Sequence, residues 1–153
     1  MSASLPLPVR LLNLAGRGAN ALGIHPIDLS LDKLLQTAMA NTGLSDFGED
    51  DFRQPLALLL DSLEKEADLS LLGRIIARGD LVRTLENRLG FVELFKQHPE
   101  IAGQRIERPI FVVGPPRSGT TIFHDLLVMD PDNRVPLTWE TARPLPPPEA
   151  STY

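Results

Sequence analysis

The stretch "PIFVVGPPRSGTTIFHDLLVMD", residues 109–130, decides the fold. It opens on an unbroken run of apolar, β-forming residues, which is typical of a strand buried on both faces of a parallel sheet. A turn rich in glycine and proline follows, and then Ile122, Leu126 and Met129 recur at helical spacing. The order strand, tight loop, helix predicts an α/β fold in which a parallel sheet is flanked by helices.

Two regions of different character meet near Arg108. Residues 1–107 carry helical periodicity and are predicted to form a helical N-terminal region, whereas residues 108–153 begin an α/β domain. Within that domain we expect a strand at 109–113, a phosphate loop at 114–121 and a helix at 120–130. A single strand has no partner to pair with, so we expect the chain to be the front portion of a longer protein.

The N-terminal region is predicted to be a packing scaffold of helices. Ser30 and Ser70 suit N-cap positions, and Pro55 suits the first turn of another helix. The helix after Ser70 contains Gly73 and Gly79, which weaken it and could divide it. A last short helix is expected over residues 91–98, because the proline that follows disfavours helical geometry in the residue before it.

The predicted loop has the composition of an anion cradle. The first amides of a helix have no intrahelical partner and point toward an incoming anion. Gly114 and Gly119 permit a sharp turn and a close approach of the backbone, whereas Pro115 and Pro116 offer no N–H. A phosphate is therefore expected to bind the amides of residues 117–121 and the hydroxyls of Ser118, Thr120 and Thr121.

The loop departs from the nucleotide-hydrolase pattern G-x-x-x-x-G-K-[ST] at one position. Thr120 stands where that pattern has its lysine, which counts against magnesium-dependent hydrolysis of ATP or GTP. The cation lies earlier, at Arg117, where a guanidinium could fork onto two anionic oxygens. This chemistry suits a ligand held by a 5′-phosphate while a second anionic group is transferred.

The segment "GPPRSGTT" at 114–121, followed by "DPDNRVPLTWETARPLPPPE" at 130–149, resembles the 5′-phosphosulfate loop of bacterial sulfotransferases. The resemblance implies a donor, 3′-phosphoadenosine 5′-phosphosulfate, and transfer of its sulfonate to a hydroxyl or amine without a metal. It assigns Arg117 to the bridging oxygen and the sulfonate, and it implies a 3′-phosphate site further along than Tyr153. The residues implied to bind the donor are Gly114, Arg117, Ser118, Gly119, Thr120 and Thr121.

The acceptor needs a general base, and Glu140 in "TWE" is the candidate that the resemblance favours. A second interpretation is that Glu140 caps a short helix or holds a loop through a salt bridge. His124 is the competing base, one turn past Thr120, and its alternative is a packed or solvated histidine.

Composition limits the partners and the setting. The net charge of −5 argues against binding to nucleic acid, and no run of residues resembles a signal peptide or a membrane span, so neither nucleic acid nor a membrane is expected as a partner. The absence of cysteine fits a reducing cytoplasm. A small-molecule acceptor is expected, and the oligomeric state is not indicated.

Two other classes of protein stay open. One is a phosphate-loop enzyme that transfers phosphoryl groups, which Thr120 argues against. The other is a helical interaction module with a vestigial loop.

Overall fold

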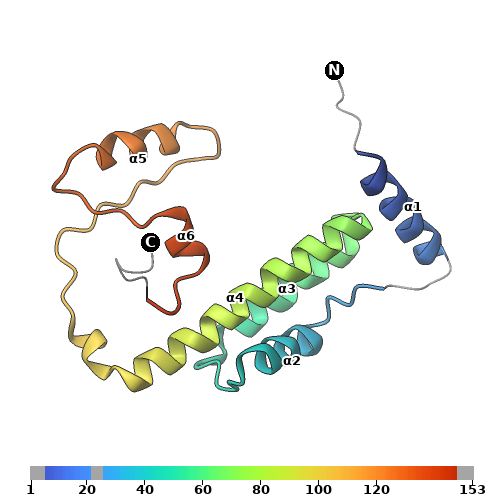
Figure 1. Ribbon diagram of the computed structural model, residues 1–153, viewed down its shortest axis with the longest axis horizontal. Coiled ribbons are helices and arrows are strands. Elements are labelled where there is room, and N and C mark those ends of the chain that lie inside the picture. The colour runs from blue at the N-terminus through green and yellow to red at the C-terminus, as the bar shows by residue number, and fades with distance from the viewer. Residues whose placement is uncertain (1–5, 22–25, 148–153) are drawn as a thin grey trace. The chain divides into compact units, whose positions relative to one another are not determined.

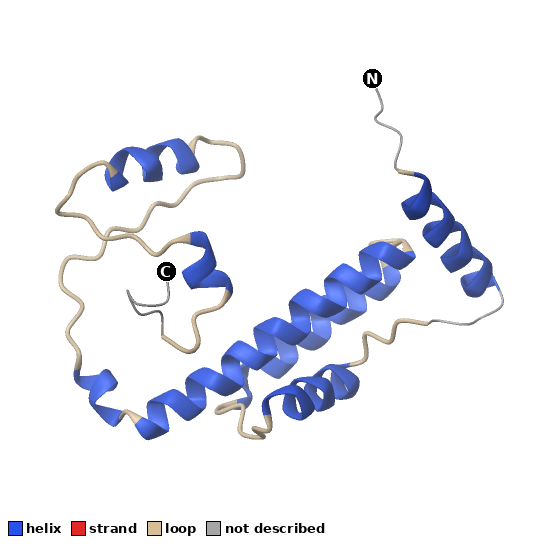
Figure 2. Cartoon of the chain, viewed as in Figure 1, coloured by secondary structure: helices blue, strands red, loops and turns tan. Residues whose placement is uncertain are grey.

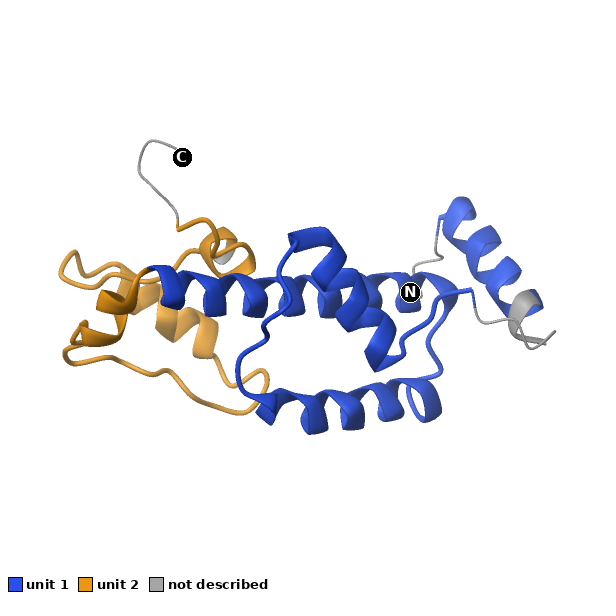
Figure 3. Ribbon diagram, turned by 90° about the horizontal axis from the view of Figure 1, so that it is seen from below, with its two compact units in different colours: residues 1–97 blue, residues 98–153 orange. Residues whose placement is uncertain are grey.

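The computed structural model describes residues 6–21 and 26–147, and the regular elements in those ranges are all helices (Figures 1 and 2). The elements are α1 Leu7–Ala21, α2 Leu31–Thr42, η1 Asp50–Phe52, α3 Arg53–Lys65, α4 Leu71–Gln97, η2 Pro99–Gly103, α5 Thr120–Val128 and α6 Thr138–Ala142. The chain forms two compact units, Met1–Gln97 and His98–Tyr153, which Figure 3 colours separately. None of the helices described is long and apolar enough to cross a membrane.

The first unit has its core around α2, which packs against both α4 and α3, while α1 packs against α4. The predicted apolar face of α2 is confirmed, because Leu34, Leu35 and Ala38 are all buried. The remaining buried apolar residues of this core are Leu29, Phe47, Leu60, Val82, Leu85 and Leu89. The unit is therefore held by a leucine-rich core of ordinary composition, as a packing scaffold requires.

The ends of α2 follow the sequence signals. Ser30 occupies the N-cap position with extended backbone, although its hydroxyl makes no capping bond and its carbonyl accepts from the Leu34 amide at 3.1 Å. At the other end Gly43 adopts a left-handed conformation, with φ 71°, and its amide donates to the Met39 carbonyl at 2.8 Å. This is the conformation that favours glycine at a helix C-terminus.

The structure corrects the prediction for the end of this unit, because the helix after Ser70 and the short helix at 91–98 are one continuous helix. This helix, α4, has 27 residues and passes through Gly73 and Gly79 without a break. Packing against α2 and α1 supplies stability that helix propensity alone does not. The helix ends at Gln97, in agreement with the proline signal at Pro99.

We expect Gly79→Ala to stabilise the protein by about 0.5–1 kcal/mol, because a methyl group there meets no atom within 4 Å and alanine is the better helix former. The midpoint of urea unfolding measures the change. Gly43→Ala is the matched control. Its methyl group also meets open space, but the φ of residue 43 is 71°, a conformation that alanine adopts only at a cost. That control should lose about 1 kcal/mol. A loss of stability in Gly79→Ala would mean that α4 is divided at this point.

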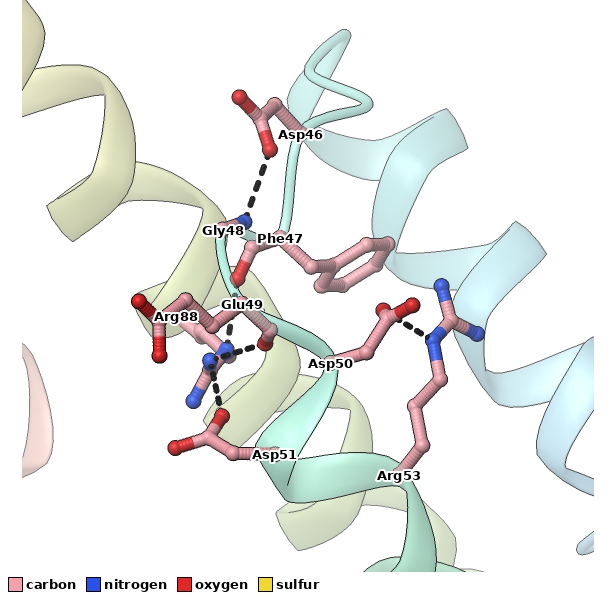
Figure 4. Close-up of polar contacts among 8 residues, drawn as sticks. All are labelled: Asp46, Phe47, Gly48, Glu49, Asp50, Asp51, Arg53 and Arg88. Atoms are coloured by element: carbon pink, nitrogen blue, oxygen red, sulfur yellow. Dashed lines mark hydrogen bonds and ion pairs between the residues drawn. The ribbon is translucent and has the colours of Figure 1, made fainter.

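Arg88 on α4 holds the loop that precedes α3 (Figure 4). Its Nε donates to the Phe47 carbonyl at 2.7 Å, and its Nη2 donates to the Glu49 carbonyl at 2.7 Å. Nη2 also lies 2.8 Å from the Asp51 carboxylate. The guanidinium carbon is 4.3 Å from the centroid of the Phe52 ring, within range of a cation–π contact. One side chain thus orders a loop that has little secondary structure of its own.

Arg74 makes a second polar link inside this unit. The side chain is buried, and it binds both carboxylate oxygens of Glu64 at 2.8 and 2.5 Å. It also donates to the Ile27 carbonyl from Nε at 3.2 Å and from Nη2 at 3.0 Å. Because a buried charge without partners is costly, these bonds explain how an arginine is tolerated there.

The predicted strand at 109–113 is not formed. These residues run as a loop, and Ile110, Phe111 and Val113 are 62%, 81% and 89% exposed. A strand needs neighbouring strands to satisfy its backbone groups and cover its side chains, and no strand occurs among residues 6–21 and 26–147. The parallel sheet therefore stays a prediction.

The predicted helix at 120–130 is confirmed as α5, which ends two residues earlier, at Val128. The proposed boundary near Arg108 falls inside the second unit, which begins at His98.

Candidate functional site

The predicted phosphate loop forms a tight turn that leads directly into α5. The Ser118 amide donates to the Pro115 carbonyl at 3.2 Å, which closes the turn. The Phe123 amide donates to the Gly119 carbonyl at 3.0 Å, which is the first bond of the helix. Loop and helix are thus joined without a spacer, in the order that a phosphate cradle requires.

The two loop glycines are needed for different physical reasons. A Cβ at Gly114 would lie 2.6 Å from the Ser118 hydroxyl oxygen and 2.9 Å from the Thr120 methyl carbon, so any side chain at this position would require Ser118 and Thr120 to move. Gly119 has open space around it but a φ of 89°, in the left-handed region that other residues adopt at a cost. The first glycine permits the fold of the loop, and the second sets the direction in which α5 leaves it.

The start of α5 presents unpaired backbone donors. The amides of Thr120, Thr121 and Ile122 have no acceptor within the described part of the chain. Such amides carry the positive end of the helix dipole. The structure narrows the predicted set of hydrogen-bond donors, since the Ser118 amide is already used in the turn and its hydroxyl is the group left to bind an anion.

Arg117 lies exposed in the middle of the loop with its charge uncompensated by any ion pair among residues 6–21 and 26–147. Its φ is 64°, and a long side chain in the left-handed region is uncommon. Backbone strain of this kind recurs at ligand-binding loops. The loop therefore offers an unpaired guanidinium beside unpaired amides and hydroxyls, an arrangement suited to an anion.

Glu140 lies on α6 and is held at both carboxylate oxygens. Oε2 accepts from the Leu137 amide at 2.5 Å, and Oε1 lies 3.0 Å from Nη2 of Arg134. The Glu140 side chain is only 6% exposed, whereas that of Arg134 is 75% exposed. The capping and salt-bridge roles foreseen as the alternative for Glu140 are both present.

Arg134 was not singled out from the sequence. It precedes Glu140 by six residues, a spacing that brings side chains together in neither a regular helix nor a strand. The pairing depends on the turn between them, and the only available signal was a cation in the same short segment as a candidate carboxylate.

His124, the competing base, lies half-exposed on α5. Its Nδ1 is 3.6 Å from a carboxylate oxygen of Asp125. It lines a groove of about 380 Å³ together with Val112, Leu127 and Arg134. No hydrogen bond or ion pair within the described residues joins His124 or Glu140 to the phosphate loop.

Comparison with known proteins identifies the segment that contains this site. Residues 109–152 match the model of a family described as the sulfotransferase family. The solved structure of sulfotransferase STF1 from Mycobacterium tuberculosis H37Rv is 40% identical to this chain and matches 80% of it, with a TM-score of 0.71. Sulfotransferase STF9 from Mycobacterium avium is 33% identical over 84% of this chain, with a TM-score of 0.73.

The chain belongs to the sulfotransferase family.

The family resemblance inferred from "GPPRSGTT" is thus confirmed, and the matched segment includes the whole phosphate loop. The chain spans about a third of the length of the two solved sulfotransferases, 34% of STF1 and 33% of STF9. These neighbours support an α/β sulfotransferase fold. The comparison with curated proteins gives no match.

Proposed function

We propose that this sulfotransferase moves a sulfonate group from 3′-phosphoadenosine 5′-phosphosulfate to a hydroxyl or amine of a small-molecule acceptor. The observation that carries the proposal is the free N-terminus of α5, where unpaired amides adjoin the uncompensated charge of Arg117. The close approach at Gly114 fits a backbone that wraps a phosphate.

In the proposed reaction the acceptor oxygen or nitrogen attacks the sulfur of the donor. A bond forms from the acceptor to sulfur, and the bond from sulfur to the bridging oxygen breaks. Adenosine 3′,5′-bisphosphate leaves, and the proton of the acceptor passes to a base. Negative charge grows on the leaving phosphate, so Arg117 and the loop amides stabilise the transition state more than the ground state.

The donor set fits this role without a metal. Thr120 occupies the position where nucleotide hydrolases place their lysine, so the loop lacks the group that those enzymes use in magnesium-dependent hydrolysis. The hydroxyls of Ser118, Thr120 and Thr121 add donors to the 5′-phosphate.

Calorimetry of the full-length protein tests the proposal. Adenosine 3′,5′-bisphosphate should bind without magnesium, and ATP should bind more weakly and show no turnover with magnesium. Magnesium-dependent ATP turnover would favour a phosphotransferase. The absence of any nucleotide binding would favour an interaction module with a vestigial loop.

Glu140 is the proposed general base, and Glu140→Gln tests that role. The amide keeps the size of the side chain and can still accept from the Leu137 amide, but it cannot take up a proton. We expect turnover to fall by about 10²-fold or more while affinity for the bisphosphate holds.

Arg134→Gln is the control for the structural role of Glu140. It removes the ion pair at 3.0 Å and leaves the carboxylate in place. If Glu140 is the general base, Glu140→Gln should lose turnover and the acidic limb of its pH profile, and Arg134→Gln should keep both. Equal losses in both variants would assign Glu140 to holding the loop and would return the role of base to His124.

A further inference from the structure

α1 has two apolar faces, and only one of them packs within the protein. The inner face meets the start of α4: a Cβ at Gly16 would lie 2.5 Å from the Leu71 Cβ, and the Leu72 amide donates to the Asn13 side chain at 3.3 Å. These contacts set the rotation of α1 about its own axis. They leave the opposite face directed away from the core of the first unit.

The outer face carries three leucines in a single stripe. Leu7, Leu11 and Leu14 follow the i, i+4, i+7 spacing of one helix face and are 65%, 58% and 66% exposed. They recur in one contiguous patch, unlike the scattered exposed leucines that any surface carries. Nothing in the described residues covers this stripe.

Arginines flank the stripe. Arg10 and Arg17 lie seven residues apart on α1, and both line a shallow groove together with Leu7, Leu11 and Leu14. The helix contains no acidic residue, and neither does the rest of residues 1–27, although the chain as a whole has a net charge of −5. Positive charge is thus segregated to one amphipathic helix of an acidic protein.

We propose that the outer face of α1 binds the surface of an anionic lipid bilayer, with the helix lying in the plane of the interface. Leucines on such a helix enter the boundary between headgroups and acyl chains, while arginines keep their guanidiniums at the level of the phosphates. Charge complementarity favours an anionic lipid surface as the partner, because a purely apolar partner would leave the guanidiniums of Arg10 and Arg17 without counter-charges.

The expectation of no membrane partner rested on the absence of a spanning segment or signal peptide, and a helix that lies on a surface needs neither. The relevant sign is the basic amphipathic pattern, which depends on the helical conformation of Leu7–Ala21. The proposal concerns a surface distant in sequence from the phosphate loop, and its test does not depend on activity.

Cosedimentation of the full-length protein with vesicles tests the proposal. The protein should sediment with phosphatidylcholine vesicles that contain phosphatidylglycerol, and much less with phosphatidylcholine alone. Raising the salt concentration should release it. Arg10→Gln with Arg17→Gln should weaken binding by about 25-fold, on the basis of roughly fivefold for each arginine at an anionic surface.

Leu11→Ser should weaken vesicle binding on the order of tenfold through the lost apolar contact. The matched controls are Leu58→Ser, at a leucine of α3 that is 66% exposed, and Arg83→Gln on α4. Neither control should change vesicle binding, and circular dichroism should confirm that all variants keep their helices.

Three results would overturn the proposal. The first is equal binding to both kinds of vesicle, or to neither. The second is an effect of the control substitutions as large as that of the α1 substitutions. The third is concentration-dependent self-association in light scattering that the α1 variants abolish without any binding to vesicles, which would assign this face to a second copy of the chain.

Discussion

Arg117→Ala is expected to lower the turnover number for sulfonate transfer by about 10²–10³-fold, comparable to the removal of one donor from an oxyanion hole. The guanidinium is exposed and has no ion pair within the described residues, so its charge is available to the leaving phosphate. Because charge grows on that group as the sulfur–oxygen bond breaks, affinity for adenosine 3′,5′-bisphosphate should fall much less. Steady-state kinetics together with calorimetry separates the two effects.

The unusual backbone of Arg117 supplies two control variants. Arg117→Gly removes the charge and relaxes a φ of 64°, whereas Arg117→Lys keeps a charge but not the fork of donors. If the charge alone matters, Arg117→Gly should be as inactive as Arg117→Ala, and Arg117→Lys should recover part of the rate. Unchanged turnover in Arg117→Ala would remove this residue from the chemistry.

Gly114→Ala is expected to lower kcat/KM by about 10²-fold, because a displacement of about 1 Å in a positioning loop has an effect of that size. The new methyl group would lie 2.6 Å from the Ser118 hydroxyl and 2.9 Å from the Thr120 methyl carbon, so these two side chains must move away from the positions proposed to bind the donor. Bisphosphate affinity should fall in parallel, since the displaced groups are among those proposed to bind the donor. Turnover and calorimetry on the same preparations check both.

A double variant with Ser118→Gly tests whether the steric conflict is the cause. Removing the hydroxyl should restore part of the activity of Gly114→Ala, so that the combined loss is smaller than the sum of the separate free-energy losses. Strictly additive losses would show that Gly114 matters for some reason other than the close approach of Ser118.

The sequence predicted the helices of the first unit where local signals and burial agree. The stripe of Leu34, Leu35 and Ala38 and the glycine stop at Gly43 are local features, and each is present. The continuity of α4 was not predictable from local signals, because packing outweighs the penalty of Gly73 and Gly79. The helix α1 was missed since its prolines and glycines obscured an amphipathic period.

In the candidate site, too, local features could be predicted from the sequence, whereas contacts that depend on the path of the chain could not. The phosphate loop is contiguous in the sequence, so its glycines, its cation and its helix start could be predicted from residue types alone. The pairing of Arg134 with Glu140 depends on a turn and could not. The strand at 109–113 depends on neighbours that no local pattern supplies.

Arg88 has a consequence for how the first unit opens. It joins α4 to groups that lie 41, 39 and 37 residues earlier in the chain, at Phe47, Glu49 and Asp51. The loop cannot swing away unless several bonds break at once, so its exchange with solvent is tied to the unfolding of α4. Among the residues that the structure describes, α1 is attached more lightly, through one hydrogen bond and the packing at Gly16. Local unfolding is therefore graded along the unit, and α1 can detach while the protected centre persists.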